Sequence, residues 1–96
     1  MVGDNLLDAP LGEFLDTLAG EGPAPGAGSA AAIVVAMAAG LVTMVARASK
    51  EFWPEAGGAI GQAEAFRARV APLAQADAEV YREALTALRR RRNAAP

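Results

Sequence analysis

The chain has 96 residues and a formal net charge of −2, and hydrophobic residues make up 53% of it. This composition excludes a disordered chain and an overall positive field that would attract nucleic acid. The chain contains no cysteine and no histidine. Disulfides, thiolate nucleophiles and histidine acid–base or metal chemistry are therefore excluded. Any chemistry must use carboxylates, hydroxyls, Lys50, Tyr81 or backbone groups.

The first predicted helix lies within residues 8–20, DAPLGEFLDTLAG. Asp8 suits the N-cap, and Pro10 suits the first helical turn because its missing N–H costs nothing there. One apolar face follows at helical spacing, formed by Leu11, Phe14, Leu15 and Leu18.

The second predicted helix follows the motif PAPGAGS, residues 23–29. We expect it to run from Ser29, whose hydroxyl can cap free N–H groups, to about Lys50. It is apolar on every side, as a helix at the centre of a bundle is. The other helical stretches are too short to enclose it, so we expect a homodimer or higher oligomer. The side chains expected to be buried are Ile33, Val34, Met37, Leu41, Met44 and Val45.

A membrane span is the alternative for this helix, since Arg47 and Lys50 follow it like a basic flank. The uncharged helical stretch has only seventeen residues, the lower limit for a span, and eight are Ala or Gly, which insert weakly. We therefore expect no membrane association. The N-terminus carries Asp4 and Asp8 rather than the basic start of a secretory signal. A cytoplasmic location is expected.

The third predicted stretch runs from about Ala59 to Arg90, after the breaker EFWPEAGG. Pro72 lies inside it and should kink it or split it in two. The run from Arg89 to Arg92 suggests an anionic partner, but cations near a helix C-terminus also complement the dipole. Because the rest of the chain is acidic, we expect no nucleic-acid binding. The predicted apolar face contains Ile60, Phe66, Val70, Leu73, Val80, Ala84 and Leu88.

The Gly-rich motif itself has two interpretations. It fits neither the dinucleotide-binding nor the P-loop fingerprint, which favours a plain structural turn. A Gly-rich turn that opens onto a helix N-terminus nevertheless presents free N–H groups, and its small residues let a flat or anionic ligand approach the backbone. The residues alone leave both interpretations open.

The stretch FLDTLAGEGPAPGAGSAAA resembles the opening of the formiminotransferase-cyclodeaminase family, whose all-helical domain also occurs alone as methenyltetrahydrofolate cyclohydrolases. The segments MVARASKEF and ADAEVYREAL continue the resemblance, which covers about residues 10–88. It implies an all-α bundle in which residues 1–96 form the front half of a single domain completed by oligomerisation. The positions that match the family's Pro-x-Pro-Gly-Gly-Gly-Ser motif are Pro23, Pro25, Gly26, Gly28 and Ser29.

The resemblance implies chemistry on a one-carbon unit carried by tetrahydrofolate. One branch of the family closes 5-formimino-tetrahydrofolate to the 5,10-methenyl form and releases ammonia, and the other hydrolyses the methenyl bridge. Neither branch needs a metal or a thiol. The substrate-binding residues that the resemblance implies are Pro25, Gly26, Gly28 and Ser29 in the loop. Arg47 and Lys50, at the end of the second predicted helix, are candidates for binding the folate glutamate tail, and the alternative is that they are two solvated helix-end cations. The alternative is a non-catalytic helical association module that has kept only the family's front half.

Asp77 is the candidate catalytic residue. It lies among the apolar residues of the third stretch, and the family pattern also places an Asp here, four residues before Tyr81. The resemblance implies that Asp77 handles a proton at a folate nitrogen, with the loop from Gly26 to Ser29 holding the substrate nearby. Alternatively, Asp77 bonds a neighbouring hydroxyl or helix N-terminus and fixes the packing.

Overall fold

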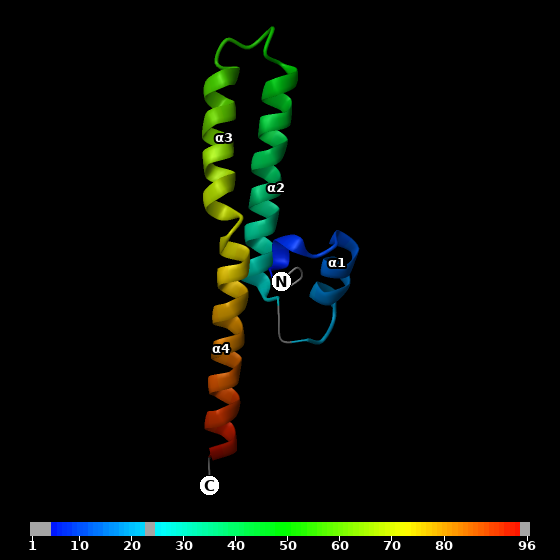
Figure 1. The fold of residues 1–96 in the computed structure, drawn as a ribbon, viewed down its shortest axis with the longest axis vertical. Helices are drawn as coiled ribbons and strands as arrows, with labels where there is room; N and C mark the ends of the chain where they lie inside the picture. Colours follow the sequence, from blue (N-terminus) through cyan, green and yellow to red (C-terminus); the bar gives the residue numbers. More distant parts are fainter. Residues whose placement is uncertain (1–4, 23–24, 95–96) are drawn as a thin grey trace.

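The computed structural model describes residues 5–22 and 25–94. Over these residues the chain is all-α and has no strand, which confirms the predicted fold class (Figure 1). Its elements are the 3-10 helix η1 (Leu6–Asp8) and the helices α1 (Leu11–Ala19), α2 (Ala27–Ala48), α3 (Ala56–Val70) and α4 (Leu73–Ala94).

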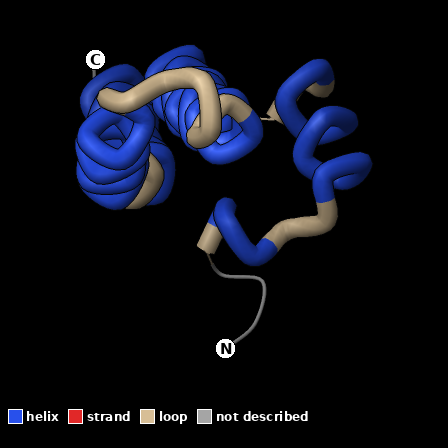
Figure 2. The backbone as a smooth tube through the Cα atoms, turned by 90° about the horizontal axis from the view of Figure 1, so that it is seen from above, coloured by secondary structure: helices blue, strands red, loops and turns tan. Residues whose placement is uncertain are grey.

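The long helices build a rod with principal extents of 68 × 24 × 23 Å. Helices α2 and α3 form an antiparallel hairpin, and α4 continues in the direction of α3 (Figure 1). The second half of α4 extends beyond the N-terminus of α2. Seen along the rod, η1 and α1 lie to one side of the helix pair (Figure 2).

The predicted break at Pro72 is confirmed, because the third stretch is two helices rather than one. Helix α3 ends at Val70 and α4 begins at Leu73. Proline has no N–H for the helical ladder, and its ring clashes with the preceding turn. The break lets α4 pack on the first half of α2, while α3 packs on the second half.

The core between these helices is built mainly from alanine. Small side chains let the helix backbones approach one another closely, which the large apolar residues would prevent. This corrects the predicted apolar face: Leu73 is 55% exposed, Val80 63% and Leu88 60%, and Phe66 and Ala84 are also exposed. The buried alanines are Ala39, Ala46, Ala56, Ala63, Ala74 and Ala78.

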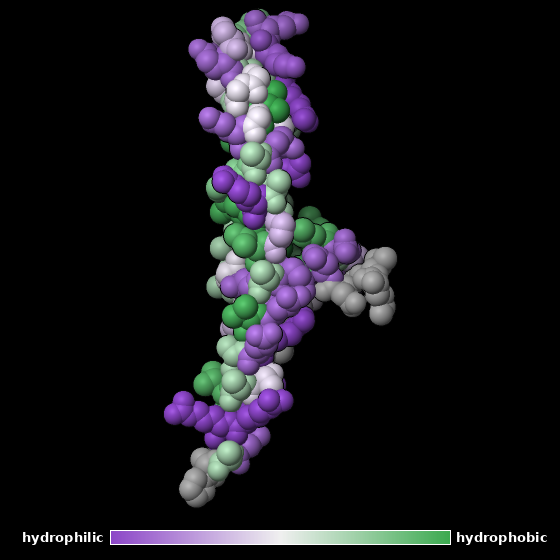
Figure 3. Space-filling view, turned by 60° about the vertical axis from the view of Figure 1, so that its left-hand side comes forward, coloured by the Kyte–Doolittle hydropathy of each residue, from purple (hydrophilic) through white to green (hydrophobic). Residues whose placement is uncertain are grey.

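Helix α2 contacts both α3 and α4 and is central to the fold, but a single chain covers only one side of it. Ile33 is half-buried. The other residues expected to be buried are exposed here, so their burial remains a prediction about an assembly. Exposed hydrophobic side chains, green in Figure 3, lie between hydrophilic ones along the rod. The large exposed side chains of α2 are Val34, Val35, Met37, Leu41, Val42, Met44 and Val45.

By length and composition alone, α2 is also apolar enough to cross a membrane, with a mean hydropathy of 2.2 over its most apolar window. Central helices of soluble proteins pass the same test. The expectation of no membrane association therefore stays a prediction.

The N-terminal elements differ from expectation in how they are capped. Asp8 does not cap α1, because it is the last residue of η1, whose first turn is capped by the side chain of Asn5. Pro10 immediately precedes α1, and its carbonyl accepts the N–H of Phe14. Only Phe14 of the predicted apolar face is buried. The backbone N–H of Leu6 donates to the Gln75 side chain at 2.9 Å, which ties η1 to α4.

Candidate functional site

Ser29 links the start of α2 to α4. Its side chain is fully buried, and its hydroxyl lies 2.7 Å from the carbonyl oxygen of Ala74 and 3.4 Å from Oδ2 of Asp77. The expectation that Ser29 begins α2 and caps it is therefore wrong. The helix begins two residues earlier, at Ala27, with Gly26 at the N-cap and no side-chain cap bond. The hydroxyl is engaged across the helix interface instead.

The carboxylate of Asp77 lies directly against the backbone of Gly28. A Cβ placed on Gly28 would lie 2.5 Å from Oδ1 and 2.6 Å from Oδ2 of Asp77. Any side chain at this position would have to displace the carboxylate. Gly28 is therefore required here for close approach, one of the uses to which glycine is suited.

Tyr81 packs on the loop one turn further along α4. A Cβ on Gly26 would lie 3.3 Å from two atoms of the Tyr81 ring, so the ring rests on the loop backbone. The backbone of Gly26 is extended, with φ −91° and ψ −177°, which any residue can adopt. Glycine at position 26 thus makes room for the Tyr81 ring and is not needed to relieve a strained turn. The four-residue spacing from Asp77 was the signal that places Tyr81 on this face.

Beside Asp77 is a shallow hollow of about 410 Å³ between α2 and α4. Its walls are apolar, and Asp77 is the single ionisable group on them. The half-buried carboxylate therefore faces a space that can admit part of a flat ligand near the start of α2. The lining residues are Gly28, Ala32, Leu73, Ala76, Asp77 and Val80.

The structure brings together most of the predicted loop site. Gly26, Gly28 and Ser29 all contact side chains or backbone of α4, and Pro25, which precedes them, is buried. Pro23 lies outside the described residues. Sequence reasoning placed Asp77 near this loop through the family resemblance, and the two do lie together.

Arg47 and Lys50 are not part of this cluster within one chain. They follow Ser29 by eighteen residues or more, which at 1.5 Å per helical residue is about 27 Å along α2. They lie at the opposite end of the helix from the loop. A single copy therefore does not present these two cations and Asp77 to the same part of a ligand.

Arg47 instead borders a second groove, of about 740 Å³, between α2 and α3. Here buried Thr43 donates a hydrogen bond to Oε2 of Glu64 at 2.9 Å. Arg67 binds both oxygens of the same carboxylate, at 2.6 and 3.1 Å. The Arg67 hydrogen bond and then the Thr43 hydroxyl lower the pKa of Glu64 from 4.5 to about 2. Sequence reasoning missed this link, although the i, i+3 spacing of Glu64 and Arg67 is typical of such pairs.

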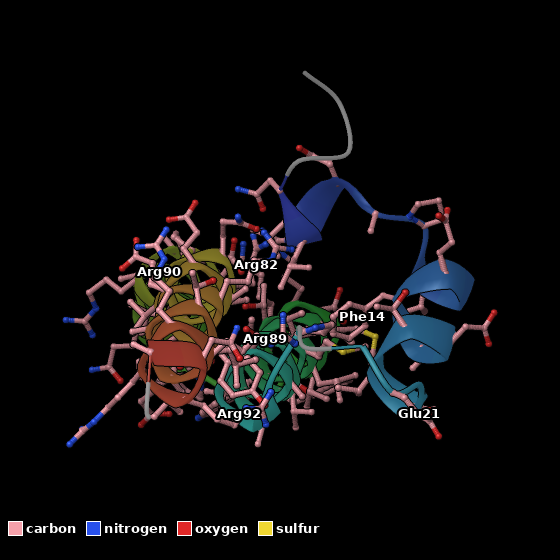
Figure 4. All side chains as sticks on the ribbon, turned by 90° about the horizontal axis from the view of Figure 1, so that it is seen from below. Phe14, Glu21, Arg82, Arg89, Arg90 and Arg92 are labelled. Atoms are coloured by element: carbon pink, nitrogen blue, oxygen red, sulfur yellow. The ribbon has the colours of Figure 1, made fainter. Side chains whose placement is uncertain are left out.

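The arginine run lies in the free end of α4. Figure 4 shows Arg89 and Arg92 projecting toward the side on which α2 lies, whereas Arg90 projects away from it. Arg91 and Arg92 are in the last turn of α4, where cations complement the helix dipole. The expectation of no nucleic-acid partner stays a prediction.

Within residues 5–22 and 25–94, no group of three or more acidic side chains is placed to hold a metal ion. The site thus consists of a carboxylate, a hydroxyl and a glycine-rich helix start. These features define an all-helical protein with a candidate small-molecule site at the start of its central helix.

The chain belongs to the formiminotransferase-cyclodeaminase family, whose model matches residues 10–95. This confirms the family suggested by the Gly-Ser motif. Comparison with curated proteins and with solved structures gave no match.

Proposed function

We propose that the protein acts on a one-carbon unit carried by tetrahydrofolate, closing 5-formimino-tetrahydrofolate to the 5,10-methenyl form with release of ammonia. The observation that carries the proposal is the contact between Asp77 and Gly28. A carboxylate and a glycine-rich helix start meet beside an apolar hollow. Membership of the family supports a folate substrate.

In the proposed reaction, N10 of the folate attacks the carbon of the protonated formimino group, and a C–N bond forms. The N10 proton passes to the formimino nitrogen, which leaves as ammonia when its bond to carbon breaks. The carbon then bridges N5 and N10 as the methenyl cation, so charge and atoms balance. Asp77 would accept the proton from N10 and return it to the departing nitrogen, the role of a general acid–base.

The remaining residues would orient the substrate. The lack of a side chain at Gly28 makes room for the Asp77 carboxylate beside the hollow. At the start of α2, amide N–H groups without a side-chain cap favour ligand acceptors. Ser29 fixes the distance between α2 and α4 through its bond to Ala74. Holding N10 and the formimino carbon in one geometry is itself a large part of catalysis for a ring closure.

Hydrolysis of methenyl-tetrahydrofolate is the other reaction within this proposal. The same carboxylate would take a proton from water as the water oxygen attacks the methenyl carbon. The bond from that carbon to N5 would then break, the proton of the added hydroxyl would pass to N5, and the 10-formyl product would form. We further propose that the protein works in the cytoplasm as a homodimer or higher oligomer. The exposed apolar face of α2 supports association.

The test is an assay of the purified chain with each substrate, following ammonia release from formimino-tetrahydrofolate and loss of methenyl-tetrahydrofolate. A parallel titration with tetrahydrofolate should raise the unfolding temperature if the ligand binds the folded chain. Turnover that exceeds the uncatalysed rate and disappears in Asp77→Asn is the expected result. If the ligand does not stabilise the chain and no turnover is detected, the chain is a helical association module instead.

A further inference from the structure

Three contacts join the start of α2 to α4, and they follow one another in antiparallel order along the two helices. The first two involve Ser29 and the carboxylate of Asp77, which belong to the candidate site. The third is between Gly26 and the ring of Tyr81, which has no part in the proposed reaction. The contacting pairs are Ser29 with Ala74, Gly28 with Asp77, and Gly26 with Tyr81.

Tyr81 makes the outermost of these three contacts. It follows Asp77 by four residues, so the two side chains share a face of α4 and are about 6 Å apart along its axis. Beyond Tyr81, α4 continues past the N-terminus of α2 (Figure 1). The ring therefore lies near the point at which the two helices separate.

Gly26 anchors the first turn of α2. It is the N-cap residue, and its carbonyl oxygen accepts the N–H of Ala30 at 3.2 Å. Gly26 offers no side chain to cap this turn, and helix ends are the parts of a helix that open most readily. A ring packed on the N-cap residue restricts such opening, and the restrained turn carries Gly28 and Ser29.

Tyr81 is placed to act on the site through Gly26 rather than by touching a ligand. The α4 residues that line the hollow end with Val80, and Tyr81 lies outside it. The atoms nearest to Gly26 are Cγ, Cδ1 and Cδ2 of the ring, so the contact does not depend on the hydroxyl. Movement of Gly26 would shift Gly28, two residues further on, relative to the carboxylate of Asp77.

We propose that Tyr81 is a positioning residue for the candidate site. Its ring holds Gly26, and through Gly26 the first turn of α2, in place against Asp77. The effect of Tyr81 on turnover rests on the proposed folate function. Its effect on the order of the first turn does not, because the opening of a backbone hydrogen bond can be measured without substrate.

Hydrogen exchange at the amide of Ala30 tests the contact without an assay of activity. We expect Tyr81→Ala to speed this exchange by about tenfold or more, because the first turn can then open locally, while amides in the middle of α2 exchange as before. Equal exchange at Ala30 in the wild-type and Tyr81→Ala chains would overturn the proposal. Should Tyr81→Ala fail to fold, Tyr81→Leu, which keeps an apolar side chain but no ring, carries the same test.

Phe66→Ala is the matched control for this experiment. The exposed fractions of the two aromatic side chains are similar, 42% for Phe66 and 40% for Tyr81, but Phe66 lies on α3. We expect Phe66→Ala to leave exchange at Ala30 unchanged. An equal increase in both variants would mean that loss of any aromatic ring loosens the fold, and would overturn the specific role of Tyr81.

Gly26→Ala checks that the two residues act on each other. Its Cβ would lie 3.3 Å from two atoms of the Tyr81 ring, closer than the optimum of about 3.5–4.0 Å between carbon atoms. Alanine is also a poorer N-cap residue than glycine whatever its neighbour, so the variant is compared with and without the ring. We expect Gly26→Ala to speed exchange at Ala30 more in the wild-type chain than in Tyr81→Ala. Equal effects in the two chains would contradict the proposed contact.

Turnover tests the positioning role itself. We expect Tyr81→Ala to lower kcat by up to about a hundredfold, the scale for a reacting group misplaced by about 1 Å, with KM nearly unchanged. Tyr81→Phe keeps the ring and should keep the wild-type kcat. An unchanged kcat in Tyr81→Ala, a rise in KM alone, or an equal loss in Tyr81→Phe would each overturn positioning by the ring. Absence of turnover in the wild-type chain would count against the folate function alone, and exchange at Ala30 would still decide whether Tyr81 holds the turn.

Discussion

The carboxylate of Asp77 touches the backbone of Gly28, leaving no room for a side chain between α2 and α4. A Cβ at Gly28 would lie within 2.6 Å of both carboxylate oxygens. Gly28→Ala should therefore move the carboxylate, and misplacement of a reacting group by about 1 Å can cost on the order of a hundredfold in rate. Turnover measured at saturating substrate tests this. A variant with normal turnover would show that Asp77 is not positioned by this contact.

Gly61→Ala is the matched control for the previous variant. Gly61 lies inside α3, and a Cβ there would meet nothing within 4 Å. We expect turnover to be unchanged and the free energy of unfolding to rise by about 0.5–1 kcal/mol, because alanine loses less backbone freedom on folding than glycine. Urea denaturation at fixed protein concentration measures the change. A destabilised Gly61→Ala chain would contradict the packing of α3 described above.

Ser29→Ala should loosen the contact between α2 and α4. The buried hydroxyl donates to the Ala74 carbonyl at 2.7 Å, and a hydrogen bond of this kind contributes about 1 kcal/mol to stability. We expect urea denaturation to show a loss of that size. Thr17→Ala is the control, since its hydroxyl bonds only to a carbonyl of its own exposed helix. Equal effects in the two variants would mean that the Ser29 bond does not hold the helices together.

The Glu64 cluster predicts a dependence of stability on acid. The pKa of Glu64 is lowered in the folded chain from 4.5 to about 2, chiefly by Arg67 and then by Thr43. The folded state thus keeps the carboxylate charged at a pH where the unfolded state is protonated. Its stabilisation is complete above pH 4.5 and is lost as the pH falls toward 2.

Glu64→Gln should therefore show a shallower loss of unfolding free energy over this acid range than the wild-type chain. Glu83→Gln, on the exposed surface of α4, serves as the control and should follow the wild type. Thermal unfolding at several pH values makes the comparison. Identical profiles for wild type and Glu64→Gln would remove the cluster from the acid response.

Much of the helical layout was predictable because local signals determine it. Pro72 lacks the N–H that a continuous helix needs, so the break between α3 and α4 follows from one residue. The long uncharged stretch after the Gly-rich motif likewise predicts α2, to within two residues at each end. The family resemblance, carried by Gly26, Gly28 and Ser29, placed the loop near Asp77.

The packing of the helices was less predictable, because contacts between distant residues decide it. The expected face of α4 contained its large apolar residues, such as Val80 and Leu88, yet the helix packs through Ala74 and Ala78. Close approach to an alanine-rich helix favours small side chains such as alanine over large apolar ones. Ser29 suits an N-cap locally, but its hydroxyl is taken by a residue forty-five positions away.

The most direct test of the account is the turnover of Asp77→Asn with formimino-tetrahydrofolate. Asparagine keeps the shape of the side chain and removes the ionisable group, so the contact with Gly28 is retained while proton transfer is lost. We predict a fall in turnover of about a hundredfold or more, the usual scale for a general acid–base, with unchanged helical content by circular dichroism. Unchanged turnover in the folded variant would contradict the catalytic role of Asp77, and loss of folding would instead assign the carboxylate to packing.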